Sequence, residues 1–418
     1  MIKNDRFSLV LRFFGVVVAT LSFAFFISPV LYAQEKIESS FAPDEVIVKM
    51  KEGTPDKDRE SVYKTHNLRP KKRLSEVSAE VVTVEAGKVK EKIADLVKDP
   101  RVEYAEPNFI ATALELTNDP GIVNNLQWGM YKVKAANAFT SAWNTAKSDP
   151  SVKVAILDTG IDQDHPDLSG KIVSQQNCTT SPTVDDLYGH GTHVAGIAAA
   201  ATNNGVGVAG LGYNATLMNA KVLGDNGSGY YSWIADCLVW AANNGAKVIN
   251  MSLGGPSKSL TLEQAINYAW NKGVAVVAAA GNSGNSSPTY PAYYKNVIAV
   301  AATDSNDAKP GWSSFGTWVD VAAPGVNIWS TFPNHPNTLG KTNYDFGSGT
   351  SMATPHVAGL AALVWPTPLG GSVSTVRKQI EGTADKITGT GKYWTYGRIN
   401  ALRAVTETGT YQTKARSK

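Results

Sequence analysis

A serine within a glycine-rich segment is a candidate catalytic residue. Ser351 follows Gly349 and Thr350 and precedes an apolar run from Val357 to Trp365, which predicts a buried helix entered through a glycine turn. The start of a helix offers free backbone N–H groups and a partial positive charge, which can stabilise an oxyanion formed at a serine. The alternative is that Thr350 or Ser351 serves only as the helix N-cap.

An aspartate and a histidine upstream lie in segments that could also do chemistry. Asp158 ends the apolar run 152–157 and precedes Thr159-Gly160. This pattern fits a turn or a metal site, whereas an aspartic protease would need a second Asp-Thr-Gly, which the sequence lacks. His190 and His193 open a predicted helix, but no third zinc ligand and no His-Glu-x-x-His glutamate accompany them. We therefore expect His190 to be a general base and His193 to pack within the helix layer.

These three residues supply the parts of a nucleophilic hydrolysis. A serine must lose its proton as it attacks a carbonyl carbon, a histidine can take that proton, and an aspartate can orient the histidine. Their order, Asp158, His190 and Ser351, is that of subtilisin. The sequence resembles the subtilases, serine endopeptidases of the subtilisin type, and most of all their thermitase-like members. The match runs from about Asp44 to about Val405 and includes segments 278–282, 288–292 and 389–394.

The resemblance also implies residues that bind the substrate. Asn282 and the backbone N–H of Ser351 would stabilise the oxyanion, although Asn282 could instead belong to a turn. Two glycine-rich segments would pair with the substrate as added β-strands, although glycines also form ordinary turns. Thr289 would lie near the floor of the P1 pocket, and because no carboxylate is expected there, we predict apolar or aromatic P1 residues. The candidate strand-pairing residues are Gly227, Ser228, Gly229, Ser252, Leu253 and Gly254.

One strong calcium site is a further implication of the resemblance. Two segments would supply most of its ligands, one at Asp119 and one around residues 203–205. The alternative is that they form only turns, the first of them before Pro120. Carboxylate, amide and carbonyl oxygens are the hard ligands that Ca²⁺ prefers. The implied ligands are the side chains of Asp119, Asp167 and Asn204 and the backbone carbonyls of Thr202, Val206 and Val208.

The loop between Gln175 and Tyr188 departs from the family pattern. Of the acid-rich second calcium loop it keeps only Asp185 and Asp186, so a second calcium is not expected. It also contains Cys178, one of two cysteines; the other, Cys237, lies in a predicted helix. Export would permit a disulfide, and two free thiols are the alternative. Neither cysteine lies at a catalytic motif, which argues against a cysteine protease.

Alternating strands and helices must position these residues. Near-continuous apolar runs are typical of parallel strands that are covered on both faces. The pattern predicts an α/β, doubly wound domain with a mostly parallel sheet over residues 115–411, whose site forms at the carboxyl ends of the strands. A basic tail follows at 412–418. Strands are expected at 152–157, 247–251, 274–280 and 297–302, and helices at 190–201, 230–243 and 262–272.

A small, highly charged module precedes this domain. Residues 34–114 include 31 charged residues among 81, whereas residues 115–418 include 40 among 304. A β-α-β-α-β pattern predicts an α+β module of two helices on a sheet, which by itself could be a binding domain or a folding aid. Residues 102–108 resemble the end of inhibitor-type subtilase propeptides. The resemblance implies a propeptide that assists folding, inhibits the enzyme and is cut by it between Phe109 and Leu116.

The first 33 residues have the features of a secretory signal peptide. A basic region with Lys3, Arg6 and Arg12 precedes an apolar core at 13–27, and Ala33 ends a cleavage motif. A membrane anchor is the alternative, but the core is short for a bilayer span. We therefore expect a secreted, monomeric enzyme that acts on polypeptides and has no membrane contact after signal removal.

Two other classes of function are less consistent with the sequence. A catalytically silent scaffold with this fold would not need Asp158, His190, Ser351 and Asn282 together. The net charge of +3 alone could suggest a nucleic-acid-binding protein, but no basic cluster with interleaved aromatic residues is present. We therefore expect no nucleic-acid partner.

Overall fold

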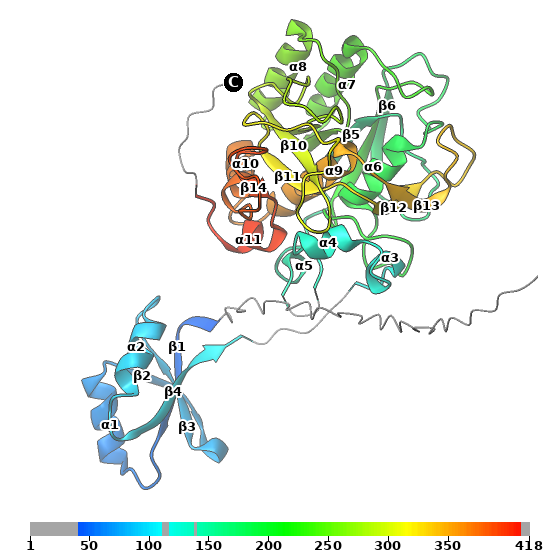
Figure 1. Cartoon of the computed structure of the whole chain (residues 1–418). Coiled ribbons are helices and arrows are strands. Elements are labelled where there is room, and N and C mark those ends of the chain that lie inside the picture. The colour runs from blue at the N-terminus through cyan, green and yellow to red at the C-terminus, as the bar shows by residue number, and fades with distance from the viewer. Residues whose placement is uncertain (1–40, 111–116, 138–139, 411–418) are drawn as a thin grey trace, which may run out of the picture. The chain divides into compact units, whose positions relative to one another are not determined.

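The computed structural model describes residues 41–110, 117–137 and 140–410, which form two compact units (Figure 1). One unit lies within residues 41–110 and the other within residues 117–410. The predicted signal peptide at 1–33, the basic tail at 412–418 and most of the predicted cleavage segment lie outside the described residues. Among the helices of the described ranges, none combines the length and the apolar content needed to cross a bilayer.

The first unit packs two helices on one face of a four-stranded antiparallel sheet with the order β2-β3-β1-β4. Its helix residues share one core with alternate residues of the strands, such as Val46 and Val48. The sequence does not predict β2, because its polar residues are almost all exposed and leave no apolar alternation. The elements are β1 (Phe41–Met50), α1 (Asp56–Thr65), β2 (Arg69–Leu74), the 3-10 turn η1 (Ser75–Val77), β3 (Ala79–Thr83), α2 (Val89–Leu96) and β4 (Val102–Phe109).

The second unit is built on an eight-stranded sheet with the order β14-β11-β10-β9-β8-β5-β7-β6, in which all neighbouring strands are parallel. This topology confirms the predicted α/β, doubly wound architecture. The strands are β5 (Lys153–Asp158), β6 (Ile172–Asn177), β7 (Thr216–Lys221), β8 (Ala246–Met251), β9 (Ala275–Ala279), β10 (Val297–Thr303), β11 (Val321–Pro324) and β14 (Gly397–Arg398). A separate antiparallel hairpin joins β12 (Ile328–Phe332) and β13 (Asn343–Gly347).

Helices cover both faces of this sheet (Figure 1). Val154 and Ile156 of β5 belong to a core shared with α6 and α9, whereas Ala155 and Leu157 belong to a second core shared with α7 and α8. Burial on both faces explains why β5 reads as one apolar run. The helices are α3 (Pro120–Val123), α4 (Trp128–Lys132), α5 (Ala142–Thr145), α6 (His190–Ala199), α7 (Tyr231–Asn243), α8 (Leu260–Asn271), α9 (Thr350–Val364), α10 (Val373–Gly382) and α11 (Ala401–Thr406).

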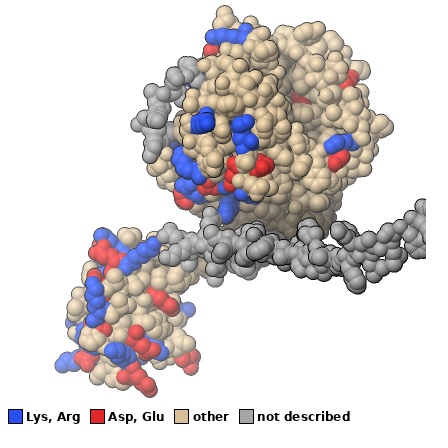
Figure 2. Space-filling model, viewed as in Figure 1, with Lys and Arg blue, Asp and Glu red and all other residues tan. Residues whose placement is uncertain are grey.

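The two units differ in how densely charged their surfaces are. Figure 2 shows Lys, Arg, Asp and Glu crowded over the visible face of the first unit, whereas much of the visible face of the second unit carries no charge. This agrees with the contrast in composition between residues 34–114 and the rest of the chain. The larger unit buries two extensive apolar clusters, one on each face of its sheet.

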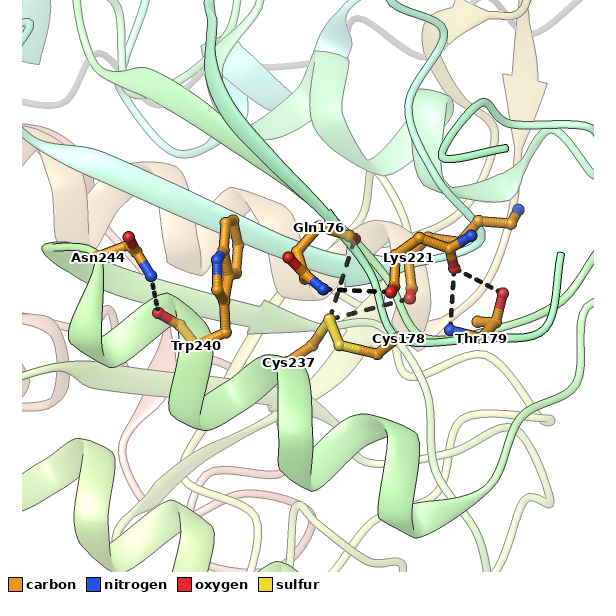
Figure 3. The surroundings of a disulfide bond; sticks show 8 residues. Gln176, Cys178, Thr179, Lys221, Cys237, Trp240 and Asn244 are labelled. Carbon is orange, nitrogen blue, oxygen red and sulfur yellow. Dashed lines mark hydrogen bonds between the residues drawn. A yellow bond between two sulfur atoms is a disulfide. The ribbon is translucent and has the colours of Figure 1, made fainter. Parts of the chain in front are cut away.

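A disulfide joins Cys178, directly after β6, to Cys237 in α7 (Figure 3). Their Cα atoms are 5.9 Å apart, and Cys237 is fully buried. The bond decides between the two alternatives left by the sequence, because neither cysteine is free. It anchors the segment that leads from β6 toward His190.

Candidate active site

Asp158 and His190 meet at the carboxyl end of β5. Asp158 is the last residue of β5, and His190 is the first residue of α6. The His190 Nδ1–H donates to Asp158 Oδ1 at 2.7 Å. Close packing of α6 on the strand end makes this contact possible, because a Cβ on Gly191 would lie 2.1 Å from the Gly160 carbonyl oxygen. Only glycine at position 191 lets the helix start so near the carboxylate.

The environment of Asp158 fixes the state of the imidazole. The carboxylate is fully buried, Oδ1 also accepts from the Thr159 N–H at 2.8 Å, and Oδ2 has no hydrogen-bond partner among the described residues. Since the proton on Nδ1 points to the carboxylate, Nε2 of neutral His190 keeps its lone pair. Burial is the largest single influence and disfavours the imidazolium, but the charge of Asp158, its hydrogen bond and the charge of Asp186 together outweigh burial and raise the pKa of His190.

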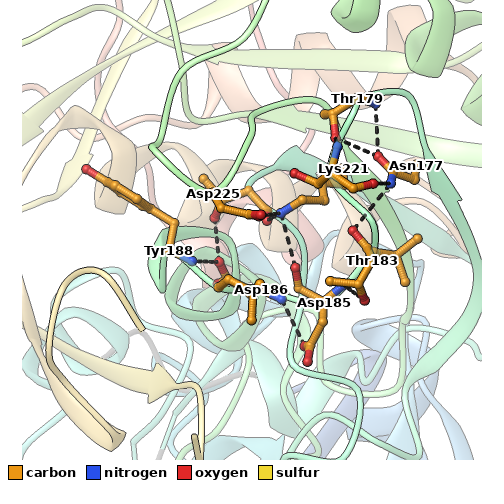
Figure 4. A network of polar contacts seen from close by, with 12 residues as sticks. Asn177, Thr179, Thr183, Asp185, Asp186, Tyr188, Lys221 and Asp225 are labelled. Carbon is orange, nitrogen blue, oxygen red and sulfur yellow. Dashed lines mark hydrogen bonds and ion pairs between the residues drawn. The ribbon is translucent and has the colours of Figure 1, made fainter. Parts of the chain in front are cut away.

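Asp186 ties the same two segments together, and sequence reasoning did not give it this role (Figure 4). Its fully buried carboxylate accepts from Thr159 Oγ1 at 2.7 Å, from the Gly189 N–H at 2.7 Å and from the Thr192 N–H at 2.8 Å. Burial raises the pKa of this carboxyl group. An aspartate shortly before a predicted helix is a capping signal, and that signal could have identified it.

His193 has a structural position, as the sequence predicts. It is fully buried, and Nε2 lies 3.0 Å from the Ile328 carbonyl oxygen. Burial lowers the pKa of His193 to about 3, so the ring is neutral near pH 7. It therefore supports α6 on the β12–β13 hairpin.

Ser351 lies in the first turn of α9, next to the end of β8. Its Oγ donates to the Ser252 carbonyl at 3.1 Å, and Ser252 Oγ donates to the Ser351 carbonyl at 2.8 Å. The Ser351 hydroxyl makes no hydrogen bond to His190 in this structure. Backbone N–H groups in the first turn of a helix have no intrahelical acceptor, so the Ser351 amide is available to a ligand.

Asn282 is held beside Ser351 through the intervening residue Thr350. The Asn282 Oδ1 accepts from both the Thr350 N–H and the Thr350 Oγ1, each at 2.9 Å. These contacts orient the amide, and its Nδ2 has no hydrogen-bond partner within the described ranges. Together with the Ser351 N–H, this NH₂ group can donate to a negatively charged oxygen.

A cleft of about 390 Å³ opens beside His190. It is lined by all six predicted strand-pairing residues, Gly227, Ser228, Gly229, Ser252, Leu253 and Gly254. Thr289 is not among the residues that line this cleft. It packs against Gly254 and Gly281, because a Cβ added to Gly254 would lie 2.7 Å from Thr289 Cγ2 and one added to Gly281 would lie 3.0 Å from Thr289 Oγ1. Tyr188, Leu223, Tyr231 and Ile234 also line the cleft and were not singled out from the sequence. The Tyr290-Pro291 bond is cis.

The implied calcium ligands converge on one loop. Asp119 and Asp167 are buried, and no Lys or Arg pairs with either carboxylate among the described residues. Asp119 accepts from the Asn203 N–H at 2.9 Å, and Asp167 from the Val208 N–H at 2.8 Å. Burial raises the pKa of Asp167. Two buried carboxylates without a positive partner are consistent with a bound cation.

The backbone of this loop also fits a hard cation. The carbonyls of Thr202, Val206 and Val208 accept no hydrogen bond within the described part of the chain. Asn204 departs from the expectation, because its Nδ2, rather than its oxygen, faces Asp167 Oδ1 at 2.9 Å. Its Oδ1 accepts from the Val206 N–H instead. Five of the six implied residues therefore present oxygens that can bind a cation.

Next to the altered loop lies Lys221, the last residue of β7 (Figure 4). Lys221 is fully buried, and its Nζ donates to the carbonyls of Thr159 and Asp185 and pairs with Asp225 at 2.9 Å. An ammonium group here supplies positive charge between β7 and the segment that leads to His190.

Comparison with known proteins identifies the family. The profile of the Subtilase family matches residues 149–404, and that of the Fervidolysin N-terminal prodomain matches residues 28–108. The chain is 43% identical to a thermophilic serine proteinase of Bacillus sp. (strain AK1) over 91% of both chains. It is 50% identical to thermitase of Thermoactinomyces vulgaris, over 69% of this chain and 98% of that protein.

The fold is also similar to that of a protease of known structure. A protease from Pseudoalteromonas arctica PAMC 21717 superposes with a TM-score of 0.63 at 33% identity, covering 70% of this chain and 99% of that chain. The fold, the site geometry and these similarities agree. The chain belongs to the subtilase family and is a subtilisin-type serine endopeptidase that is made with an N-terminal propeptide.

Proposed function

We propose that this chain hydrolyses peptide bonds with a triad of Asp158, His190 and Ser351. The observation that carries the proposal is the 2.7 Å hydrogen bond between Asp158 and His190 at the mouth of the cleft. Ser252, which lines that cleft, is hydrogen-bonded to Ser351 in both directions. The base therefore lines the cleft, and the nucleophile would lie next to it, behind Ser252.

The chemical steps follow from these contacts. Ser351 Oγ turns from the Ser252 carbonyl toward His190 Nε2 and attacks the substrate carbonyl carbon while its proton passes to Nε2. Asp158 stabilises the imidazolium, and the Asn282 NH₂ and the Ser351 N–H donate to the new oxyanion. The imidazolium then protonates the leaving amine, and the C–N bond breaks. Water hydrolyses the acyl-serine by the same proton transfers in reverse order.

Substrate binding is proposed along both walls of the cleft. An extended peptide would pair with residues 227–229 on one side and 252–254 on the other. Thr289 would border the P1 pocket, which presents no carboxylate, so apolar or aromatic P1 residues should be preferred to Lys or Arg. A panel of chromogenic peptides that differ only at P1 tests this, and an optimum at Arg would contradict it.

Calcium is the proposed cofactor of the loop at 202–208. Asp119, Asp167 and the carbonyls of Thr202, Val206 and Val208 would hold it, and Asn204 would join after its amide turns over. When bound, the ion neutralises two buried carboxylates and so contributes to stability. It has no step in peptide hydrolysis.

The proposed precursor is secreted and processes itself. Residues 1–33 are the proposed signal peptide, residues 34–114 the propeptide, residues 115–411 the catalytic domain and residues 412–418 a basic tail. The propeptide would assist folding and then block the cleft until the enzyme cuts it, and the released enzyme would be a monomer. N-terminal sequencing of secreted material tests signal removal, and an intact Met1 would contradict it.

Labelling with a fluorophosphonate probe tests the proposed nucleophile directly. Such probes react with an activated serine, so one label on Ser351 is expected, located by mass spectrometry. Ser351→Ala should abolish labelling, whereas Ser348→Ala, an exposed serine three residues earlier, should not. Labelling of Ser351→Ala equal to wild type would contradict the assignment.

A further inference from the structure

Three side chains from separate segments bring metal-ligand atoms together beside the proposed triad. Asp162 follows β5, Asp185 precedes α6, and His335 lies between β12 and β13. One ligand atom from each lies within 4.8 Å of the others. Asp162 is 1% exposed, while the side chains of Asp185 and His335 are 30% and 26% exposed, so the cluster has a buried floor and an open entrance.

The tautomer of His335 points its lone pair at this cluster. Its Nδ1 lies 3.1 Å from the Pro336 carbonyl oxygen, which can only accept, so Nδ1 carries the proton. Neutral His335 therefore has its lone pair on Nε2, 3.4 Å from Asp185 Oδ2. Nε2 is itself buried and makes no hydrogen bond within the described residues. A lone pair facing two carboxylates is unfavourable, so the ring is favoured as an imidazolium paired with Asp185 when no metal is bound: although burial opposes this, the Pro336 carbonyl and the Asp185 and Asp162 carboxylates raise the pKa of His335. A divalent cation between the ring and the carboxylates would take the place of that proton.

Surrounding hydrogen bonds hold the three segments in register. Asp162 Oδ2 accepts from the Asn334 N–H at 2.7 Å, next to His335. The same loop bonds to the segment after Asp185, because the Thr338 N–H donates to the Leu187 carbonyl at 3.0 Å. In Figure 4 the Asp185 carboxylate lies on the side away from Lys221, and Lys221 Nζ contacts Asp185 at its backbone carbonyl oxygen. Lys221 therefore does not occupy the cluster.

From these observations we propose that Asp162, Asp185 and His335 bind a divalent first-row transition ion. A donor set of two carboxylates and one imidazole suits Zn²⁺, Mn²⁺ or Co²⁺ better than Ca²⁺, which prefers oxygen only. The donation from Nδ1 to a carbonyl is the outer contact that usually orients a metal-bound histidine. Asp164 is exposed, is hydrogen-bonded to Asn334 and contacts the Asp162 side chain, but its carboxylate lies outside the three whose ligand atoms converge.

Such an ion would join the two segments that carry Asp158 and His190 to the β12–β13 loop. This role is separate from peptide hydrolysis and from the proposed calcium loop. It predicts that Zn²⁺ raises the melting temperature even when the nucleophile is blocked and calcium is in excess.

Isothermal titration calorimetry with Zn²⁺ tests the proposal. The purified protein is first inhibited with a sulfonyl fluoride, then freed of metal with a chelator and finally transferred to excess Ca²⁺. One Zn²⁺ per chain is expected. His335→Gln and Asp185→Asn should each weaken binding at least tenfold. Asp164→Asn, which removes a neighbouring charge, should change it by less than about threefold, because its carboxylate lies outside the ligand set.

Melting temperatures measured without zinc show whether each variant is folded. Because His335 and Asp185 lie in different segments, one variant still tests the proposal if the other does not fold. Absence of 1:1 binding in the wild type would overturn the proposal. Zn²⁺ binding that survives unchanged in a folded ligand variant would place the ion elsewhere, for instance at His190, and would overturn it as well.

Discussion

At the scale of single residues, the proposed chemistry depends on the protonation state of His190. The Asp158 carboxylate raises the pKa of His190, whereas burial lowers the pKa of His193 to about 3 and that of His356 to about 4. Catalysis needs a neutral imidazole at position 190. Since His193 and His356 are neutral throughout the pH range in which His190 titrates, neither of them contributes to the pH dependence, which should report His190.

The rate should rise with pH as His190 loses its proton. Since its folded pKa is raised above the ordinary value of 6.5, the inflection of kcat/KM should lie above that value. Asp158→Asn should lower kcat on the order of 10⁴-fold and move the inflection to lower pH. His335→Gln is the control and should keep the wild-type profile. An unchanged inflection in Asp158→Asn would contradict the pairing.

Asn282 should matter for the transition state and little for substrate binding. Asn282→Ala removes one oxyanion donor and should reduce kcat on the order of 10²–10³-fold with little change in KM, the magnitude known for this amide in subtilisin itself. Steady-state kinetics on a chromogenic peptide measure it. The control Asn285→Ala alters an exposed turn nearby and should retain wild-type kcat. A loss expressed only in KM would argue against the oxyanion role.

At the scale of elements, the sequence predicts four strands that are buried on both faces, β5, β8, β9 and β10. It misses the short apolar strand β11 and the strands that carry polar residues. The run 152–157 became β5, shifted by one residue. β6 and β7 were not predicted, because β6 is only half-buried and β7 buries Asn219 and Lys221 through tertiary hydrogen bonds. The roles of Asp186 and Lys221 depend on contacts between segments distant in sequence, which apolar periodicity does not report.

Calcium removal should destabilise the catalytic unit. Without a cation, the buried Asp119 and Asp167 carboxylates repel each other, so excess chelator should lower the melting temperature. A ligand at a thousandfold excess over Kd contributes about 4 kcal/mol, or roughly 10 °C for a domain of this size. Differential scanning fluorimetry of the inhibited enzyme measures it. Chelator should no longer lower the melting temperature of Asp167→Asn, whereas it should still lower that of the surface control Asp149→Asn. A wild-type melting temperature that does not change with chelator would contradict the proposed calcium site.

The disulfide should stabilise the segment that leads to His190. Cys178 and Cys237 are 59 residues apart, and a bond closing a loop of that size typically contributes about 2–4 kcal/mol. The double variant Cys178→Ser/Cys237→Ser should lower the free energy of unfolding by that amount in urea. Dithiothreitol should reproduce the loss in the wild type and have no effect on the double variant. Equal stability with and without the bond would refute its role.

At the scale of the whole molecule, two units with different surfaces share one chain. Residues 41–110 fold into a charged α+β unit, and residues 117–410 form the doubly wound unit with the cleft. The sequence predicts both, because their composition and periodicity differ sharply. It also pointed to six of the residues that line the cleft, but not to Tyr188, Leu223, Tyr231 and Ile234, which line it as well. Whether the two cysteines form a disulfide or remain free thiols could be decided only from the three-dimensional structure.

Self-processing links these scales, because it needs the nucleophile, the strand-end geometry and the propeptide in one molecule. Purified precursor, incubated with calcium and analysed by intact-mass spectrometry, measures it directly. We predict that the wild type yields a new N-terminus between residues 110 and 116, that Ser348→Ala does the same, and that Ser351→Ala remains uncut. Cleavage of purified Ser351→Ala at the same position and rate would contradict the central claim that Ser351 is the nucleophile.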